Sequence, residues 1–559
     1  MNSQPQRTVS LDLQSHLAEL ERRGLLVRID DPIDKDTELH PLVRCQFVGG
    51  LPERDRRAFL FTNVVDCTGK KYDMPVVVGA LAASPEIYSV GMGVPADRIR
   101  SAWATAIANP IPPMVVERGS CQDVVITGDD LKKPGGGLAH LPVPVSTPGF
   151  DAAPTLTATL CITKDPENGI ANMSTNRAAL KSTDRLAVRM SSRIGGSGGY
   201  RHWLKYQKLG RPMPCAIVVG AAPVIAYNGP QRLPYDFDEM TVAGALAGGP
   251  MKVVRAKTID VMVPADAEIV IEGLISTELL EPEGPFGEST GYVALEDYNL
   301  SMEVTAITHR KSPVFTSIIS QVTPSESSVM RKVALEPLFL THLRDGLGIR
   351  GIKQVSMHEN LSNLRPLIFL QFSDDTPRTE VWRGLQGASS RIADCGKIVI
   401  AVSEDVDPAN PNAVFWSMAY RSNPIEDVLV VPFRSPGHGP SSDRKPGVEP
   451  DPRTANSTLL IDATLKHPMP PIALPAKPYM ERAQEIWNRL KLPPVNFQAP
   501  WHGYLLGDWS EQWETFAQNA TAAKWEENGT NTLARRRGGL KPETPVRSVE
   551  RQSPGGGQV

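Results

Sequence analysis

The sequence lacks the features that mark disulfide-stapled, zinc-stabilised or membrane-spanning proteins. Its six cysteines are scattered, with no CxxC pair and no Cys/His cluster, which argues against a disulfide framework or a structural zinc site. No apolar run approaches the length of a membrane-spanning helix, and the opening MNSQPQRTVSLDLQSH has no apolar stretch of the signal-peptide kind. We therefore expect reduced thiols and a cytoplasmic protein without a membrane span.

Other features that the sequence lacks exclude some classes of function and fold. The net charge of -3 gives no reason to expect a nucleic acid or an acidic membrane as partner. Neither a GxxxxGK[ST] phosphate loop nor a GxGxxG motif after a strand occurs. Aromatic residues make up only 6%, whereas there are 50 prolines, which favours short strands and turns over long helical bundles. With 559 residues, 41% of them hydrophobic, the chain can bury the cores of several globular units.

The pattern along the chain predicts five segments. Residues 1–119 mix helix and strand signals and predict an N-terminal α+β domain. Residues 120–322 are rich in β-branched runs and predict a β-rich, barrel-like domain. Residues 323–490 alternate helix and strand, which predicts an α/β domain with a parallel or mixed sheet. Residues 491–529 hold four tryptophans and predict an arm docked on protein, whereas residues 530–559 predict a disordered tail.

Several helices are predicted from local sequence signals. Ser10 is expected to cap a first helix that ends at Gly24. The buried face of that helix is expected to consist of Leu13, Leu17 and Leu20. Helices are also expected over residues 183–194 and 238–248, inside the β-rich domain. An amphipathic helix near residues 481–492 is expected to contact a neighbouring subunit.

Two glutamates flank a rigid turn in the stretch EPEGPFGESTGY. Glu283 and Glu288 lie on either side of Gly-Pro-Phe-Gly, and such a turn can fold two carboxylates toward one another. Two close carboxylates cannot both ionise cheaply, so the pKa of one member of such a pair rises and it becomes a candidate proton donor. A surface loop with solvated glutamates is the alternative at this point.

Arginines and glycines gather in the stretch GIANMSTNRAALKSTDRLAVRMSSRIGGSGGYRHW. Arginines beside a glycine-rich turn suit a phosphate, although glycines of this kind also serve as flexible linkers. Glu239 opens a helix pattern, where a carboxylate is usually only a favourable dipole contact. Lys397 opens a strand pattern, where a lysine usually faces solvent.

Together and in this order, these stretches resemble the UbiD family of reversible decarboxylases. The resemblance runs from SLDLQSHLAELERRGLLVRID through GIANMSTNR and EPEGPFGESTGY to CGKIVIAVSEDVDP and LLIDATLK, over about residues 10–490. It implies an N-terminal α+β unit, a central split β-barrel-like flavin-binding domain and a C-terminal α/β oligomerisation domain. It also implies a non-oxidative carboxy-lyase in which prenylated FMN serves as the electron sink.

The resemblance assigns roles position by position. It implies a catalytic set in which Arg177 orients the substrate carboxylate, Glu288 donates a proton and Glu283 holds Arg177. It implies that Asn172 and Glu239 bind a divalent metal, manganese in the family, and a potassium ion is a further candidate. The implied cofactor contacts are Asn172, Thr175, Asn176, Arg177, Arg189, Met190, Ser191, Ile194, Gly195, Glu239 and Lys397.

One position departs from the family pattern. Many members have a histidine as third metal ligand where this chain has Arg193, and a guanidinium has no lone pair for a cation. Either His202 takes that place, or Arg193 meets the phosphate directly, and we favour the second. His202 is then expected to be a hydrogen-bonded interior histidine.

The implied substrate is an aromatic or α,β-unsaturated acid, free or as a CoA thioester, with Ser289 as a candidate substrate contact. A flavin prenyltransferase is the implied supplier of the cofactor, and a homo-oligomer, dimeric or hexameric, is the implied assembly. An FMN-binding reductase and a non-catalytic scaffold subunit are the alternatives. A reductase has no need for the Arg-Glu-Glu set.

Overall fold

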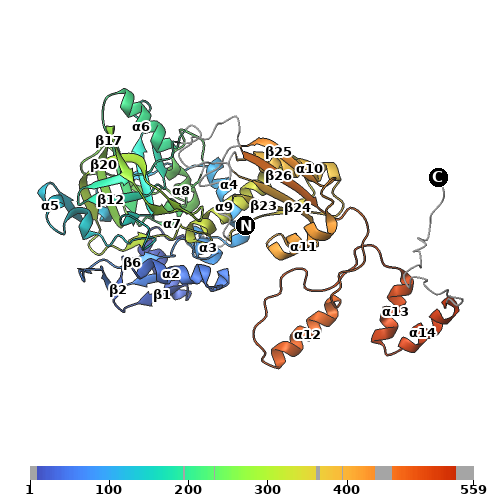
Figure 1. Cartoon of the computed structure of the whole chain (residues 1–559). Coiled ribbons are helices and arrows are strands. Elements are labelled where there is room, and N and C mark those ends of the chain that lie inside the picture. Colours follow the sequence, from blue (N-terminus) through green and yellow to red (C-terminus); the bar gives the residue numbers. More distant parts are fainter. Residues whose placement is uncertain are drawn as a thin grey trace, which may run out of the picture. The chain divides into compact units, whose positions relative to one another are not determined.

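The computed structural model describes residues 9–192, 196–231, 233–360, 365–392, 395–434 and 456–536. The chain divides into two compact units, Met1–Thr464 and Leu465–Val559, which are treated separately (Figure 1). Over the described ranges no helix is both long and apolar enough to cross a membrane. The cysteines form no disulfide in the described chain, as expected from their spacing.

The first helix, α1 (Leu13–Arg22), is capped by Asp12 rather than by Ser10. Oδ1 of Asp12 accepts a hydrogen bond from the N–H of Ser15 at 2.8 Å, which satisfies a donor of the first turn. Ser10 lies too far ahead of the helix to reach those N–H groups. The predicted leucines Leu13, Leu17 and Leu20 are buried. Gly24, with φ of +68°, reverses the chain after the helix.

The N-terminal part is built on a four-stranded sheet of order β1-β3-β6-β21. Its strands are β1 (Leu26–Ile29), β3 (Ala58–Phe61), β6 (Val76–Val78) and β21 (Phe315–Ser317). Nearby lie β2 (Ile33–Asp34), β4 (Val64–Val65), β5 (Lys71–Tyr72), α2 (Leu39–Val48), α3 (Pro85–Met92), α4 (Ile99–Ala108), η1 (Glu53–Asp55) and η2 (Ala96–Arg98). Because β21 comes from beyond the central sheet in sequence, it joins the N-terminal part to the centre.

The central part is one nine-stranded sheet of order β11-β10-β14-β17-β20-β13-β12-β9, with β8 also paired to β20. Its pairs are antiparallel. The strands are β8 (Val124–Thr127), β9 (Thr155–Leu156), β10 (Thr159–Lys164), β11 (Ala171–Ser174), β12 (Ala178–Ser182), β13 (Arg185–Val188), β14 (Met213–Val219), β17 (Ile269–Glu283) and β20 (Asp297–His309). In the residues that are described, the pairing path stays open, so the centre is a split rather than a closed β structure.

Short elements complete the central part. Its minor sheets contain β7 (Met114–Val115), β15 (Lys252–Arg255) and β16 (Met262–Pro264), and separately β18 (Phe286–Gly287) and β19 (Val293–Ala294). Its helices are α5 (Asp129–Lys132), α6 (Gly198–Lys208), α7 (Pro223–Ala226) and α8 (Glu239–Ala247), with the 3-10 turns η3 (Ser120–Gln122) and η4 (Gly137–His140). The helix predicted over residues 238–248 is therefore confirmed as α8.

The helix predicted over residues 183–194 is wrong. Strand β13 occupies its first half, and residues 189–192 are irregular. Val188 pairs with Ala178 of β12 on one side and with Leu300 of β20 on the other. Backbone pairing on both sides outweighs the helical preference of the isolated stretch.

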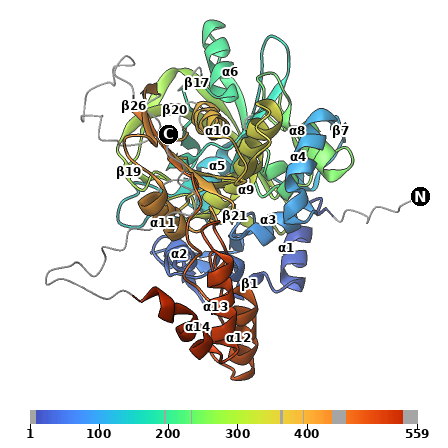
Figure 2. The same ribbon diagram turned by 90° about the vertical axis from the view of Figure 1, so that its right-hand side faces the viewer.

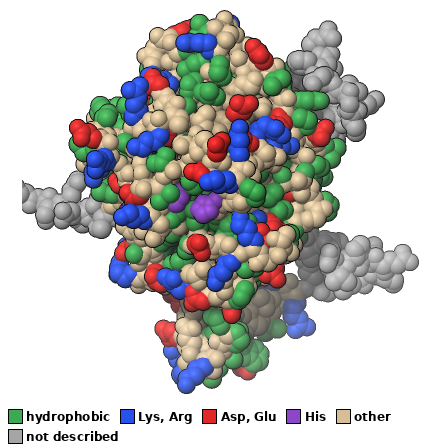
Figure 3. Space-filling model, turned by 90° about the vertical axis from the view of Figure 1, so that its left-hand side faces the viewer, with side chains coloured by type: hydrophobic (Ala, Val, Ile, Leu, Met, Phe, Trp, Pro, Cys, Tyr) green, Lys and Arg blue, Asp and Glu red, His purple; other side chains and the backbone are tan. Residues whose placement is uncertain are grey.

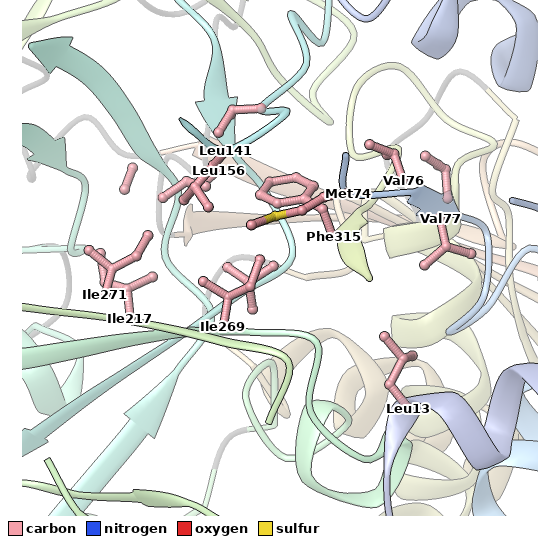
Figure 4. Packing of buried hydrophobic residues seen from close by; sticks show 14 of the residues in the cluster. Leu13, Met74, Val76, Val77, Leu141, Leu156, Ile217, Ile269, Ile271 and Phe315 are labelled. Carbon is pink, nitrogen blue, oxygen red and sulfur yellow. The ribbon is translucent and has the colours of Figure 1, made fainter. Parts of the chain in front are cut away.

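A large core lies between the N-terminal and central sheets (Figure 4). Ile217 of β14 and Ile269 of β17 lie on one side, and Val77 of β6 lies on the other, with Met74 and Phe315 between them. Each such side chain contributes about 1.5–3 kcal/mol when it is fully buried. This packing fixes the central sheet on the N-terminal part.

The C-terminal part of the first unit is a mixed sheet of order β22-β23-β24-β26-β25, covered on both faces (Figures 1 and 2). Its elements are β22 (Ile352–Met357), β23 (Leu367–Phe372), β24 (Ile398–Ser403), β25 (Val428–Arg434), β26 (Asn456–Ala463), α9 (Glu326–Thr341), α10 (Arg378–Ser390), α11 (Pro411–Arg421) and the π-helical turn η5 (His342–Gly346). Val399 and Ala401 pack in the cluster of α10, whereas Ile400 and Val402 pack in that of α11. The predicted mixed α/β architecture is confirmed.

The second unit contains α12 (Lys477–Arg489), α13 (Glu511–Thr521), α14 (Trp525–Thr532) and η7 (Leu533–Arg535). Between residues 465 and 536 no described side chain is buried, and Trp513 and Trp525 are 44% and 63% exposed. Docking of this arm on protein therefore stays a prediction. Residues 537–559 of the predicted tail lie outside the described residues.

Buried charges meet where α9 joins the N-terminal part to the C-terminal sheet. Nζ of Lys332 lies 3.4 Å from Oε1 of Glu53, and Oε1 of Glu336 accepts the N–H of Met357 at 2.8 Å. Glu359 lies in the same group. Burial raises the pKa of Glu336 and of Glu359 to about 7, although Lys332 acts in the opposite direction.

We expect Glu336→Gln to flatten the pH dependence of stability. Folding raises the pKa of Glu336 from 4.5 to about 7. Its contribution to stability is therefore complete below pH 4.5, the unfolded pKa, and is lost as the pH rises through about 7. Glutamine keeps the acceptor for Met357 but cannot ionise. The melting temperature of the variant relative to that of the wild type should therefore rise as the pH is raised between these two pKa values. Exposed Glu404→Gln is the control, and a gain independent of pH would contradict the prediction.

Candidate active site

Four neighbouring strands bring the candidate residues to one edge of the central sheet. Leu300 of β20 pairs with Leu280 of β17 on one side and with Val188 of β13 on the other. Val188 in turn pairs with Ala178 of β12, so the four residues form one row across the sheet. The next residues along these strands, on the same side of the row, include Glu283, Asn299, Arg189 and Arg177. The backbone N–H of Arg189 also donates to the carbonyl of Arg177 at 3.0 Å.

A tight turn brings Glu288 back to this edge. Gly284 has φ of +109°, a conformation that glycine adopts without strain. A Cβ on Gly287 would overlap the hydroxyl of Thr147, and its N–H donates to Oδ1 of Asp151 at 2.8 Å. Glycine is thus required at both positions, and the turn is fastened to the preceding loop.

Arg177 contacts both carboxylates at once. Its Nε and Nη2 donate to the two oxygens of Glu283 at 2.8 and 3.0 Å, and its Nη1 donates to Oε1 of Glu288 at 2.6 Å. The ring of Phe286 lies 4.3 Å from the guanidinium carbon. Burial lowers the pKa of Arg177, but the two carboxylates outweigh it and the net pKa is raised. The prediction that the turn brings the two glutamates together is confirmed.

Arg189 is a second guanidinium in the same group. Its Nη1 lies 3.0 Å from Oε1 of Glu288 and 4.0 Å from Oε2 of Glu283. Asn299 Nδ2 donates to Oε2 of Glu283 at 3.0 Å. The side chains of Arg189, Glu288 and Glu283 are 20%, 9% and 1% exposed, so the four charges balance in a nearly dry site. The sequence associated Arg189 with the cofactor and gave no hint of its contact with Glu288.

A second group of oxygens lies along β11 and the start of α8. Oε2 of Glu239 accepts the N–H of Met173 at 2.8 Å, next to Asn172. A Cβ on Gly198 would overlap Oδ1 of Asn172, so this oxygen lies against the first residue of α6. Burial raises the pKa of Glu239 to about 7, which a bound cation would counter by favouring the ionised form.

This group fits a hard cation next to a phosphate. Amide and carboxylate oxygens suit such a cation, and the N–H groups at the start of α6 suit an anion. In the described part of the chain no three His, Cys, Asp or Glu residues group as a metal site. Arg193, Ile194 and Gly195 lie outside the described residues.

The other predicted cofactor contacts border this group. The N–H of Thr175 donates to the carbonyl of Gly229 at 3.1 Å, and Nδ2 of Asn176 donates to the hydroxyl of Ser174 at 2.7 Å. The Sδ atom of Met190 lies 2.9 Å from where a Cβ of Gly199 would be, and the carbonyl of Ser191 accepts the N–H of Ser197 at 2.8 Å. These contacts join Thr175 to Gly229, and Met190 and Ser191 to the residues at the start of α6.

Lys397 and His202 make contacts other than those with Asn172 and Glu239. Lys397 is exposed, and its carbonyl accepts the N–H of Leu459 at 2.8 Å in the C-terminal sheet. No contact seen among the described residues joins it to Asn172 or Glu239. Nδ1 of buried His202 lies 2.9 Å from Oγ1 of Thr163, and its Nε2 lies 3.7 Å from Asp165. His202 is therefore the hydrogen-bonded interior histidine that we favoured.

The sequence matches the three domains of 3-octaprenyl-4-hydroxybenzoate carboxy-lyase in order. The N-terminal domain matches residues 17–107, the Rift-related domain 114–322 and the C-terminal domain 328–463. These matches span most of the chain and identify it as a carboxy-lyase. The chain belongs to the UbiD family.

Solved structures agree with this fold. The UbiD-class enzyme HmfF from Pelotomaculum thermopropionicum in complex with FMN is 28% identical, with a TM-score of 0.70 over 81% of this chain and 94% of that chain. An evolved dimeric form of HmfF in complex with prFMN is 27% identical, with a TM-score of 0.69 over 82% and 96%. The apo 3,4-dihydroxybenzoic acid decarboxylase of Enterobacter cloacae, 23% identical with a TM-score of 0.70 over 88% and 98%, shares the fold.

Proposed function

We propose that this carboxy-lyase removes CO₂ from an aromatic or α,β-unsaturated carboxylic acid, without net oxidation, using prenylated FMN. The observation that carries the proposal is the buried set of Arg177, Glu283 and Glu288 at one sheet edge. Binding of FMN and of prFMN by HmfF supports the choice of cofactor. When bound, the prenylated flavin supplies the electron sink for the carbon that loses CO₂.

Arg177 orients the substrate carboxylate in this proposal. Three of its five N–H groups donate to the two glutamates, and contacts among the described residues leave the other two for an incoming carboxylate. Charge-assisted hydrogen bonds of this kind are worth about 1.5–3 kcal/mol each. Glu283 fixes the guanidinium through two of its N–H groups, which keeps the remaining donors aimed in one direction.

Glu288 donates the proton that replaces CO₂. It is the more exposed of the two glutamates, at 9% against 1%, and only one of its oxygens contacts Arg177. Its place on the turn lets it approach a substrate held by the same arginine. The surrounding apolar and paired groups exclude water, so the proton comes from Glu288 and not from solvent.

Asn172 and Glu239 would hold a divalent metal, with manganese as the first candidate, which would neutralise negative charge on the cofactor phosphate. Residues Thr175 to Arg177 and Arg189 to Ser191 border the cofactor, and Ile194 and Gly195 remain predicted contacts. Lys397 reaches the phosphate only if the C-terminal sheet approaches the centre. A potassium ion is a further candidate in the same proposal.

Gly198→Ala should weaken the metal site. Its Cβ would overlap Oδ1 of Asn172, which must then turn away. We expect metal affinity to fall about tenfold or more, the usual scale for loss of support around a metal ligand. Elemental analysis of protein dialysed against Mn²⁺ measures this. Gly249→Ala is the matched control, because nothing lies within 4 Å of its Cβ, and equal metal content in both variants would contradict the prediction.

The remaining expectations belong to the same proposal. The substrate is a free acid or a CoA thioester, with Ser289 next to it, and a flavin prenyltransferase supplies the cofactor. A cytoplasmic homo-oligomer, dimeric or hexameric, is the proposed assembly, divided into the five segments that the sequence predicts.

Co-expression with a flavin prenyltransferase tests the function. Small molecules released from the purified protein are identified by mass spectrometry and absorbance, and CO₂ release is measured over a panel of aromatic and unsaturated acids. Prenylated FMN together with CO₂ release supports the proposal. Unmodified FMN alone, despite active prenyltransferase in the same cells, would favour the FMN-binding reductase or the scaffold subunit.

A further inference from the structure

One oxygen of Glu288 is shared by two guanidinium groups. Oε1 lies 2.6 Å from Nη1 of Arg177 and 3.0 Å from Nη1 of Arg189. Arg177 also holds other groups: its Nε and Nη2 donate to Glu283, and the ring of Phe286 covers its face. Glu288 is the one carboxylate within hydrogen-bond distance of Arg189 among the described residues, since Glu283 is 4.0 Å away.

A backbone hydrogen bond fixes the position of Arg189, whose side chain contacts Glu288. Its N–H donates to the carbonyl of Arg177 at 3.0 Å, directly after the row of paired strands. Glu288, in contrast, lies on a turn that is held through Asp151 and not by a strand of the main sheet. An acid on such a turn needs a further contact to keep a defined position when a substrate approaches Arg177.

The charges around Glu288 come from three elements. Arg177 and Arg189 arrive from the β12–β13 hairpin, Glu283 from the end of β17, and Asp151 from the loop that holds Gly287. When Arg177 binds a substrate carboxylate, its charge is shared with that group. Arg189 still contacts Glu288 at that point, so its charge can orient Glu288 and stabilise its ionised form after proton transfer.

We infer that Arg189 is a positioning residue for Glu288: it holds the acid at the sheet edge and stabilises the carboxylate that proton donation leaves behind. The inference rests on the proposed function, since it requires Glu288 to be the proton donor. It gives Arg189 a role distinct from contact with the cofactor.

The test compares Arg189→Gln with Arg189→Lys and with Arg185→Gln in cofactor-loaded enzyme. Arg185 lies on the same strand and pairs with Glu281 at 3.0 Å, but it is 48% exposed and outside the cluster. For each protein, kcat and KM are measured across pH, and bound flavin is quantified by absorbance after release. A group that must be protonated for turnover produces a high-pH limb in the kcat profile.

Loss of the Arg189 charge should move that limb upward by about one pH unit, the lower end of the effect of a close opposite charge. With rates normalised to bound flavin, we expect kcat to fall at the optimum and KM to stay within about twofold. Lysine should restore part of the wild-type profile, and it keeps the test open if glutamine prevents folding. Arg185→Gln should match the wild type.

Two results separate the possible failures. If Glu288→Gln is inactive but both Arg189 variants keep the wild-type limb, or lose flavin without moving it, the inference is overturned and the proposed function stands. If Glu288→Gln turns over like the wild type, the assignment of the acid fails, and the inference fails with it.

Discussion

Glu288→Gln should lower the rate of CO₂ release about a thousandfold, within the range that general acid catalysis supplies. Glutamine has nearly the same shape and keeps an oxygen to accept from Arg177 at the position where Oε1 now accepts at 2.6 Å. It cannot donate a proton to carbon in place of CO₂. Initial rates of CO₂ release, normalised to bound flavin, measure the effect.

The control for this variant is Glu281→Gln. Glu281 lies on the same strand as Glu283 but pairs with exposed Arg185 at 3.0 Å, outside the cluster. It should keep turnover within about twofold of the wild type, as exposed ion pairs contribute little. Full activity in Glu288→Gln would remove this residue as the acid, and loss of flavin in the same variant would point to a role in binding.

Arg177→Met should both abolish turnover and destabilise the fold. The variant leaves Glu283, whose side chain is 1% exposed, without its two-point partner. Among the described residues Asn299 still donates to it at 3.0 Å. Removing one member of a buried ion pair typically costs about 3–5 kcal/mol. Denaturant and thermal unfolding of the flavin-free protein measure this loss separately from catalysis.

Arg185→Met provides the comparison for stability. It removes an arginine of a neighbouring ion pair that is 48% exposed, so its effect should stay below about 1 kcal/mol. Equal unfolding curves for the Arg177 and Arg185 variants would show that the buried cluster adds nothing to stability. Arg177 would then be kept for binding alone.

Much of the fold could be predicted because it follows from local patterns. The spacing of Leu13, Leu17 and Leu20 identified the first helix, and runs of β-branched residues identified the β-rich centre. The approach of Glu283 and Glu288 was also predictable, because a Gly-Pro-Phe-Gly turn leaves few paths for the chain. These features depend on residues that are close in the sequence.

The rest depends on pairing between distant segments. Residues 185–188 form a strand only because β12 and β20 lie on both sides, and the mistaken helix concealed that Arg189 faces Glu288. The cap of α1 moved from Ser10 to Asp12, a difference of two residues that composition alone does not resolve. Whether Lys397 reaches the cofactor depends on the approach of a separate sheet, which no local pattern encodes.

The row of paired residues next to the site, Leu280, Leu300, Val188 and Ala178, limits where residues can be inserted or deleted. The pairing of β12 with β13 is regular from Ala178 to Leu180 and from Leu186 to Val188, and one residue added there would send Arg177 or Arg189 to the opposite face of the sheet. The pairing of β17 with β20 is irregular between Ile275 and Leu280, so a length change there can be absorbed before Glu283. We expect homologues to gain and lose residues at that irregular stretch more readily than in the regularly paired parts of β12 and β13 that precede and carry Arg177 and Arg189.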